Sequence, residues 1–182
     1  MDRPALFLDR DGVINRDDGY THRVDDFVFI DGVFAVARWA AERGWPLFVV
    51  TNQGGIGKGL YSEADFAVLT EWVEARFAAE GGPVRQTYYS PYHPDGTGRF
   101  GRDSRCRKPQ PGMLLDASRD HGIDLAGSIM VGDKESDMEA ARRAGISRRV
   151  LFGTDCGRNS AATAAVADHA GLLRWLDEQE RA

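Results

Sequence analysis

The chain has 182 residues, a formal net charge of −5, and apolar and charged shares of 42% and 28%. These values are typical of a soluble globular domain and argue against nucleic acid or an anionic membrane surface as the main partner. There is no apolar run of about 18 residues, and the first residues carry charges where a secretion signal has an apolar core. We therefore expect one cytoplasmic domain over residues 1–182.

The predicted strands are five short apolar runs, and helical periodicity fills the segments between them. The strands are expected at 5–8, 46–50, 86–89, 129–131 and 150–152. The helices are expected at 33–43, from Ser62 to Gly81, from a first-turn Pro111 to His121, and from a capping box at Ser136–Glu139 to Gly145. This alternation predicts an α/β fold, a Rossmann-like parallel five-stranded sheet with helices on both faces. About twenty residues separate Asp11 from Asp31, which is enough for a flap but not for a large cap domain.

Polar residues follow the carboxyl ends of the predicted strands, where ligands bind in open parallel sheets. Four loops carry them: Asp9 and Asp11, then Thr51-Asn52-Gln53, then Arg107-Lys108, and finally Asp133-Lys134. Asp9 and Asp133 are suitable oxygen ligands for Mg²⁺ shared with a phosphate. Acidic turns at strand ends are also common without function, so the prediction depends on the four loops meeting at one edge.

This residue set suits phosphoryl transfer. With a reference pKa of ~3.9, Asp9 would be ionised at neutral pH and available as a nucleophile without a base. Asp11 could donate a proton to the leaving oxygen and later take one from water. Thr51 and Lys108 would hold the phosphoryl oxygens, where charge accumulates in the transition state. For Asp137 a structural interpretation is available, because it could accept backbone N–H groups near the start of a helix.

The motifs DRDGV, VVTNQ, CRKPQPG and VGDKESD, in this order, resemble those of the haloacid dehalogenase superfamily of aspartate-nucleophile phosphatases. Longer stretches, including FLDRDGVIN, VVTNQGGIGKG and MVGDKESDMEAA, are similar to the D-glycero-D-manno-heptose 1,7-bisphosphate 7-phosphatase family, over roughly 5–151. The resemblance implies a haloacid dehalogenase-like fold. It also implies a nucleophile at Asp9, an acid/base at Asp11 and phosphoryl contacts from Thr51 and Lys108.

The same resemblance implies the ligands of the metal and of the substrate. Asp9 and Asp133 would bind Mg²⁺ through their carboxylates, and Asp11 through its backbone. The substrate contacts would come from Asp17, Gly19, Tyr20, Asn52, Gln53, Arg107 and Lys134. Arg107 is suited to a second phosphate, because a guanidinium can bind phosphate through two hydrogen bonds.

The sequence departs from this family at a zinc-binding loop. The positions that would hold four Cys or His ligands read Ser90, Tyr92, Ser104 and Cys106. Hydroxyl groups are poor replacements for the N and S donors of structural zinc sites. We therefore predict no structural zinc, with loop 92–107 held by other contacts. Cys106 and Cys156 are also too few for a disulfide framework, which fits a reducing compartment.

The resemblance implies a Mg²⁺-dependent phosphatase that removes the 7-phosphate of a heptose bisphosphate through an aspartyl-phosphate intermediate. With loops alone covering the site, we expect a monomer. Two alternatives remain open at this stage. One is a histidinol-phosphate phosphatase, which would use the same residues with different loops. The other is a catalytically inactive sugar-phosphate-binding protein, an interpretation that the loss of the zinc ligands supports.

Overall fold

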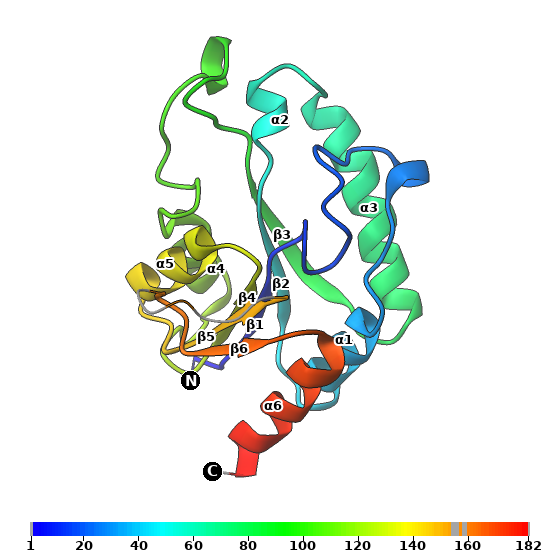
Figure 1. Cartoon of the computed structure of the whole chain (residues 1–182), viewed down its shortest axis with the longest axis vertical. Helices are drawn as coiled ribbons and strands as arrows, with labels where there is room; N and C mark the ends of the chain where they lie inside the picture. Colours follow the sequence, from blue (N-terminus) through cyan, green and yellow to red (C-terminus); the bar gives the residue numbers. More distant parts are fainter. Residues whose placement is uncertain (1, 154–156, 158–159, 182) are drawn as a thin grey trace.

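The computed structural model describes residues 2–153, 157 and 160–181, so Cys156 lies outside the described residues. Its centre is a six-stranded parallel sheet with the order β3-β2-β1-β4-β5-β6 (Figure 1). The strands are β1 (Leu6–Leu8), β2 (Leu47–Asn52), β3 (Val84–Ser90), β4 (Ile129–Gly132), β5 (Arg148–Phe152) and β6 (Ala164–Val166). The predicted α/β class and all five predicted strands are confirmed. The count of five is wrong by one, because β6 adds an edge strand.

Helices cover both faces of the sheet. They are α1 (Val33–Glu42), the short α2 (Gly54–Gly57), α3 (Glu63–Ala79), α4 (Gly112–His121), α5 (Glu135–Ala144) and α6 (His169–Arg181), with 3₁₀ turns η1 (Val24–Asp26) and η2 (Gly98–Phe100). Two predicted helix starts are corrected. Pro111 is the N-cap of α4 rather than its first residue. The N-cap of α5 is Lys134, whose backbone N–H donates to Asp137 Oδ2 at 3.0 Å, so no capping box joins Ser136 to Glu139.

Alternating side chains of the strands build two separate cores. Leu6 and Leu8 of β1 point to the face covered by α1, α3 and α6, whereas Ala5 and Phe7 point to the face covered by α4 and α5. Figure 1 shows the two helix layers on opposite sides of the sheet. Successive side chains of a strand point to opposite faces of the sheet, and helices cover both faces. Each central strand is therefore a continuous apolar run in the sequence.

The segment between β1 and α1 forms the predicted flap. It turns back on itself through an antiparallel bridge between Asn15 and Phe29 and contains only the η1 turn. Within the described residues, no large cap domain is inserted. None of the helices described is both long and apolar enough to cross a membrane.

Candidate active site

The ends of β1, β2 and β4 bring the predicted residues to one edge of the sheet. Asp9 follows β1, and Lys108 reaches it from the loop before α4, with 2.8 Å between Lys108 Nζ and Asp9 Oδ1. The same ammonium lies 2.6 Å from Asp137 Oδ1 and donates to the Val50 carbonyl at 2.7 Å. Both Asp9 and Lys108 are buried. The structure therefore holds a charged lysine against the predicted nucleophile.

Burial changes the protonation expected at this pair. It raises the pKa of Asp9 to about 7, against the opposing effect of the Lys108 ammonium. The reference pKa used in the sequence argument therefore does not apply to the protein alone. Burial also disfavours the charged form of Lys108, but the Asp137 and Asp9 carboxylates outweigh it and raise the pKa of the lysine. A cation beside Asp9 would favour its ionised, nucleophilic form.

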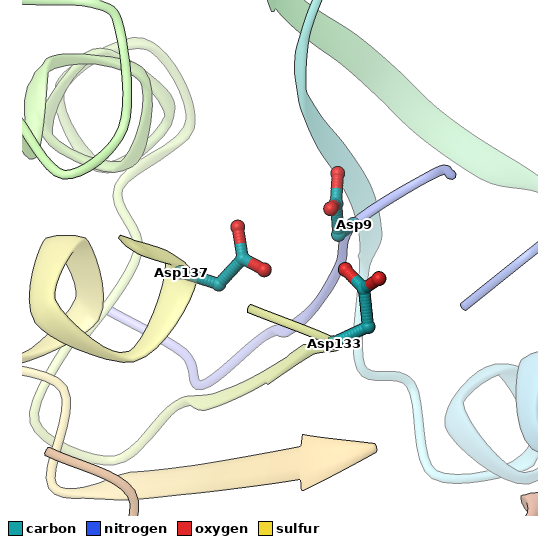
Figure 2. Close-up of side chains that lie close together, drawn as sticks. All are labelled: Asp9, Asp133 and Asp137. Carbon is teal, nitrogen blue, oxygen red and sulfur yellow. The ribbon is translucent and has the colours of Figure 1, made fainter. Parts of the chain in front are cut away.

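Three carboxylates converge at this edge, as Figure 2 shows. One oxygen each from Asp9, Asp133 and Asp137 lie within 4.8 Å of one another, and this is the one such cluster of three or more potential ligands in the described part of the chain. Asp133 Oδ1 is buried and has no hydrogen-bond partner among the described residues. Burial also raises the pKa of Asp133. An unpartnered buried carboxylate oxygen in a group of acids fits a hard divalent cation.

The backbone beside this cluster leaves room only for glycine. Gly12 has φ +89°, and a Cβ atom there would lie 2.2 Å from Asp133 Oδ2. The turn after Asp11 can therefore pass directly over Asp133. This close approach brings two loops that are 120 residues apart in sequence to the same carboxylates.

The side chain of Asp11 does not join the carboxylate cluster. It accepts hydrogen bonds from Arg10, Asn15 Nδ2 and Gln53 Nε2, the last two at 3.0 Å. The Arg10 contact is an ion pair of 2.9 Å. The structure surrounds its carboxylate with hydrogen-bond donors.

The Thr51-Asn52-Gln53 segment lies where it was predicted, but two of its side chains are already engaged. Asn52 makes two hydrogen bonds to the backbone of Lys108. Gln53 is buried, and its amide donates to Thr51 Oγ1 at 2.8 Å as well as to Asp11. Both residues line the cavity, yet the amide of Asn52 is bonded to a neighbouring backbone and that of Gln53 to neighbouring side chains. The Thr51 hydroxyl accepts from Gln53 and keeps its own hydrogen for a ligand.

A cavity of about 300 Å³ opens above these residues. Its lining includes most of the predicted site: Asp9, Asp11, Asp17, Gly19, Tyr20, Thr51, Asn52, Gln53, Lys108 and Lys134. Lys134 Nζ lies 2.9 Å from Asp17 Oδ2, which joins the flap to the start of α5. Tyr20 is 47% exposed and accepts a hydrogen bond from Lys58 at 2.9 Å. The flap thus supplies one wall of the cavity.

Arg107 lies at the margin of the cavity rather than in its lining. Its Nη1 donates to the Tyr92 carbonyl at 3.0 Å and lies beside Gly54, which does line the cavity. No carboxylate in the described part of the chain forms an ion pair with Arg107. Its guanidinium therefore keeps donors for an anion.

Loop 92–107 is ordered by an ion pair, backbone hydrogen bonds and aromatic packing. Arg99 pairs with Glu63 at the start of α3, and Thr97 N donates to the Gly57 carbonyl at 2.8 Å. The rings of Tyr92 and Phe100 pack edge to face at 5.4 Å. These contacts are of the kind that the sequence argument required in place of zinc. The absence of zinc itself stays a prediction.

Two side chains of the site, Arg10 and Tyr61, were not predicted from the sequence, and neither was one of the two contacts of Asp137. Arg10 contacts the Asp11 carboxylate, Tyr61 lines the cavity and donates to Gln53, and both are buried. Asp137 does accept the backbone N–H of Lys134, as expected, but its other oxygen also pairs with Lys108. For Asp137, its position at the start of α5, shortly after Asp133, was an available signal.

Comparison with known proteins gives concordant results. Residues 105–173 match a family model described as HAD-hydrolase-like. The chain is 49% identical over 168 residues to a D-glycero-alpha-D-manno-heptose-1,7-bisphosphate 7-phosphatase of Burkholderia mallei, covering 92% of this chain and 87% of that protein. It is also 49% identical over 152 residues to a D-glycero-beta-D-manno-heptose-1,7-bisphosphate 7-phosphatase of Photorhabdus laumondii, covering 83% and 81%.

A solved structure agrees with these relatives. The D,D-heptose 1,7-bisphosphate phosphatase from B. bronchiseptica, complexed with magnesium and phosphate, superposes with a TM-score of 0.83 at 29% identity. The match covers 97% of this chain and 99% of that one. With its fold, its strand-end carboxylates and its extensive identity to these enzymes, the chain belongs to the haloacid dehalogenase-like phosphatases, in the family of the heptose-1,7-bisphosphate 7-phosphatases.

Proposed function

We propose that this phosphatase is Mg²⁺-dependent and removes the 7-phosphate of D-glycero-D-manno-heptose 1,7-bisphosphate. The observation that carries the proposal is the placement of Asp9 against Lys108 and within the carboxylate cluster, at the floor of one cavity. The names of the relatives at 49% identity support the substrate. Because one of these relatives is named for the alpha and the other for the beta anomer, identity alone does not favour either form.

The proposed reaction has two steps. An Asp9 carboxylate oxygen attacks phosphorus while the bond from phosphorus to the sugar oxygen breaks, and Asp11 gives its proton to that oxygen. Water then attacks the aspartyl phosphate, Asp11 takes a proton from it, and phosphate leaves with the Asp9 carboxylate restored. Lys108 and the Thr51 hydroxyl donate to the phosphoryl oxygens, where negative charge grows.

Two members of the carboxylate cluster would bind Mg²⁺, and the third contacts Lys108. Asp9 and Asp133 would hold Mg²⁺, together with the backbone carbonyl of Asp11, and the unpartnered Asp133 oxygen is the free donor that this requires. Asp137 keeps Lys108 charged and in place. Bound Mg²⁺ would neutralise charge on the phosphoryl group and favour the ionised form of Asp9.

The second phosphate of the substrate would face the margin of the cavity. Arg107 is half-buried, unpaired with any carboxylate of the described residues, and held toward Gly54 by loop 92–107. A histidinol amine would instead call for added carboxylates there. The charge at this margin therefore favours a bisphosphate. The proposal also includes one domain over 1–182, a monomer, and a cytoplasmic location.

The test is phosphate release by purified protein with Mg²⁺. We expect rapid release from heptose 1,7-bisphosphate, with one anomer preferred, and slow release from histidinol phosphate. Asp9→Asn should lose activity by at least about a thousandfold, whereas Asp103→Asn, an acidic residue of the loop outside the cavity lining, should keep it. Preference for histidinol phosphate would contradict the substrate. Full activity of Asp9→Asn would contradict the mechanism.

A further inference from the structure

The Asp11 carboxylate occupies a site already filled with hydrogen-bond donors. Arg10 Nη2 lies 2.9 Å from Oδ1 and 3.0 Å from Oδ2, and Arg10 Nε lies 3.2 Å from Oδ1. Asn15 adds a donor to Oδ1, and Gln53 adds one to Oδ2. A carboxylate offers about four lone-pair positions in all. These contacts use them, so the side chain must release at least one donor before it can exchange a proton with a ligand.

Arg10 is fixed by more than its ion pair with Asp11. It is buried, and its guanidinium lies 5.9 Å from the centre of the Phe27 ring and 5.8 Å from that of Phe66. The same Nη2 donates to the Thr21 carbonyl at 2.7 Å. Because Thr21 belongs to the flap, Arg10 connects the position of the flap to the position of Asp11.

Tyr61 fixes the orientation of the Gln53 amide, which is another hydrogen-bond donor to Asp11. Its hydroxyl donates to Gln53 Oε1 at 2.5 Å, and its ring is buried and stacks on His22, with 4.9 Å between the ring centres. This bond decides which end of the amide faces the acid. With the oxygen of Gln53 engaged, its nitrogen is left to donate to Asp11 and Thr51. A reversed amide would place an oxygen against the carboxylate.

We propose that Arg10 and Tyr61 are positioning residues for Asp11, Arg10 by direct contact and Tyr61 through Gln53. The inference rests on the proposed function, in which Asp11 is the proton donor. As the bond between Asp9 and phosphorus forms and the bond to the leaving oxygen breaks, the proton of Asp11 passes to that oxygen. Arg10 and Gln53 set the place from which the carboxyl group turns toward it.

The experiment separates proton donation from the rest of the reaction. In single-turnover measurements, leaving-group release is timed for heptose 1,7-bisphosphate and for 4-nitrophenyl phosphate. The sugar needs a proton to leave, whereas nitrophenolate leaves without one. The variants are Tyr61→Phe and Arg10→Lys. The control is Tyr88→Phe, which also removes a hydrogen-bonded hydroxyl, but one that contacts Asp120 outside the cavity.

We expect both variants to release the sugar about tenfold more slowly and to release nitrophenolate within about twofold of the wild-type rate. The control should match the wild type on both substrates. Equal slowing on the two substrates, or no slowing on either, would overturn the inference. Should Arg10→Lys not fold, Tyr61→Phe decides the question by the same comparison.

Failure of the proposed substrate gives a different result. Wild-type protein that cleaves 4-nitrophenyl phosphate but not the heptose bisphosphate would contradict the substrate only. The comparison is then made with glycerol phosphates or another alkyl phosphate that the wild type does cleave, since these leaving groups also need a proton. Wild-type protein that cleaves no phosphate monoester would overturn both the mechanism and the positioning roles.

Discussion

Asn52 and Lys108 are joined by two hydrogen bonds that use both ends of one amide. Asn52 Nδ2 donates to the Lys108 carbonyl, and the Lys108 backbone N–H donates to Asn52 Oδ1, each at 3.0 Å. This pairing ties the last residue of β2 to the loop before α4. It fixes the backbone from which the lysine reaches Asp9.

Replacement of Asn52 should therefore act through Lys108. We expect Asn52→Ala to lower kcat at least tenfold, because the lysine loses its fixed approach to the phosphoryl oxygens, and to cost about 1–3 kcal/mol of unfolding free energy. Steady-state kinetics and urea denaturation measure the two effects. Ser128→Ala is the matched control. It removes two hydrogen bonds of the buried Ser128 hydroxyl, just before β4, so stability should fall with kcat unchanged.

Magnesium should stabilise the protein through Asp133. At a concentration about a hundred times its Kd, a ligand of the folded state adds about 2.7 kcal/mol, which corresponds to a rise of several degrees in Tm. Asp133→Asn should lose this rise, yet be at least as stable as wild type without metal, because one charge leaves a crowded cluster. Glu139→Gln, on the outer face of α5, should keep the rise. A magnesium-dependent rise in Asp133→Asn equal to that of wild type would contradict the assignment.

Loop 92–107 should need no zinc. We expect elemental analysis of purified protein to find less than about 0.1 zinc per chain, and one zinc per chain would contradict the prediction. Arg99→Ala should raise KM for the bisphosphate a few fold with little change in kcat, because the loop carries Arg107 but not the reacting groups. The change in KM should be small, since an exposed ion pair such as Arg99–Glu63 stabilises a folded structure by less than about 1 kcal/mol.

Acid should destabilise the fold through His169. This residue is buried, its Nδ1 faces the Asp31 carbonyl at 3.0 Å, and its Nε2 has no partner among the described residues. Burial lowers the pKa of His169, so below pH 6.5 the unfolded chain binds a proton that the folded chain does not.

The contribution of neutral His169 to the free energy of unfolding is therefore fully present above pH 6.5. It is lost as the pH falls toward the lowered pKa of His169. Between pH 7.5 and 5, wild type should lose about 1–2 kcal/mol more unfolding free energy than His169→Gln. Denaturant titrations at the two pH values measure the difference. Equal losses in the two proteins would show that His169 does not titrate differently on unfolding.

The sequence predicted the central sheet well because its strands are buried on both faces. Runs such as 46–50 are apolar without interruption, a pattern typical of a parallel sheet covered by two helix layers. The sixth strand was not predicted because Ala164–Val166 is three residues long and mostly alanine, which has little preference for strands. It pairs with β5 at the edge of the sheet, and tertiary packing rather than local preference places it there.

The sequence predicted which side chains meet at the edge of the sheet, but not the contacts that they make there. Strand-end position brought Asp9, Thr51, Lys108 and Asp133 together, since topology alone decides which loops meet. Substrate contact by Asn52 and Gln53 stays a prediction, but the hydrogen bonds of their amides to Lys108, Asp11 and Thr51 were not predicted. Such partners have no sequence periodicity. The raised pKa of Asp9 was likewise out of reach, because it depends on burial.

The ion pair between Arg99 and Glu63 affects which solution conditions change the order of loop 92–107. A loop closed by thiolates around zinc is opened by chelators and oxidants. An arginine and a glutamate on the surface are indifferent to both, but salt screens their attraction, and the Debye length falls to about 3 Å at 1 M ionic strength. The contribution of this ion pair to the order of loop 92–107, and with it to the position of Arg107, therefore weakens as ionic strength rises.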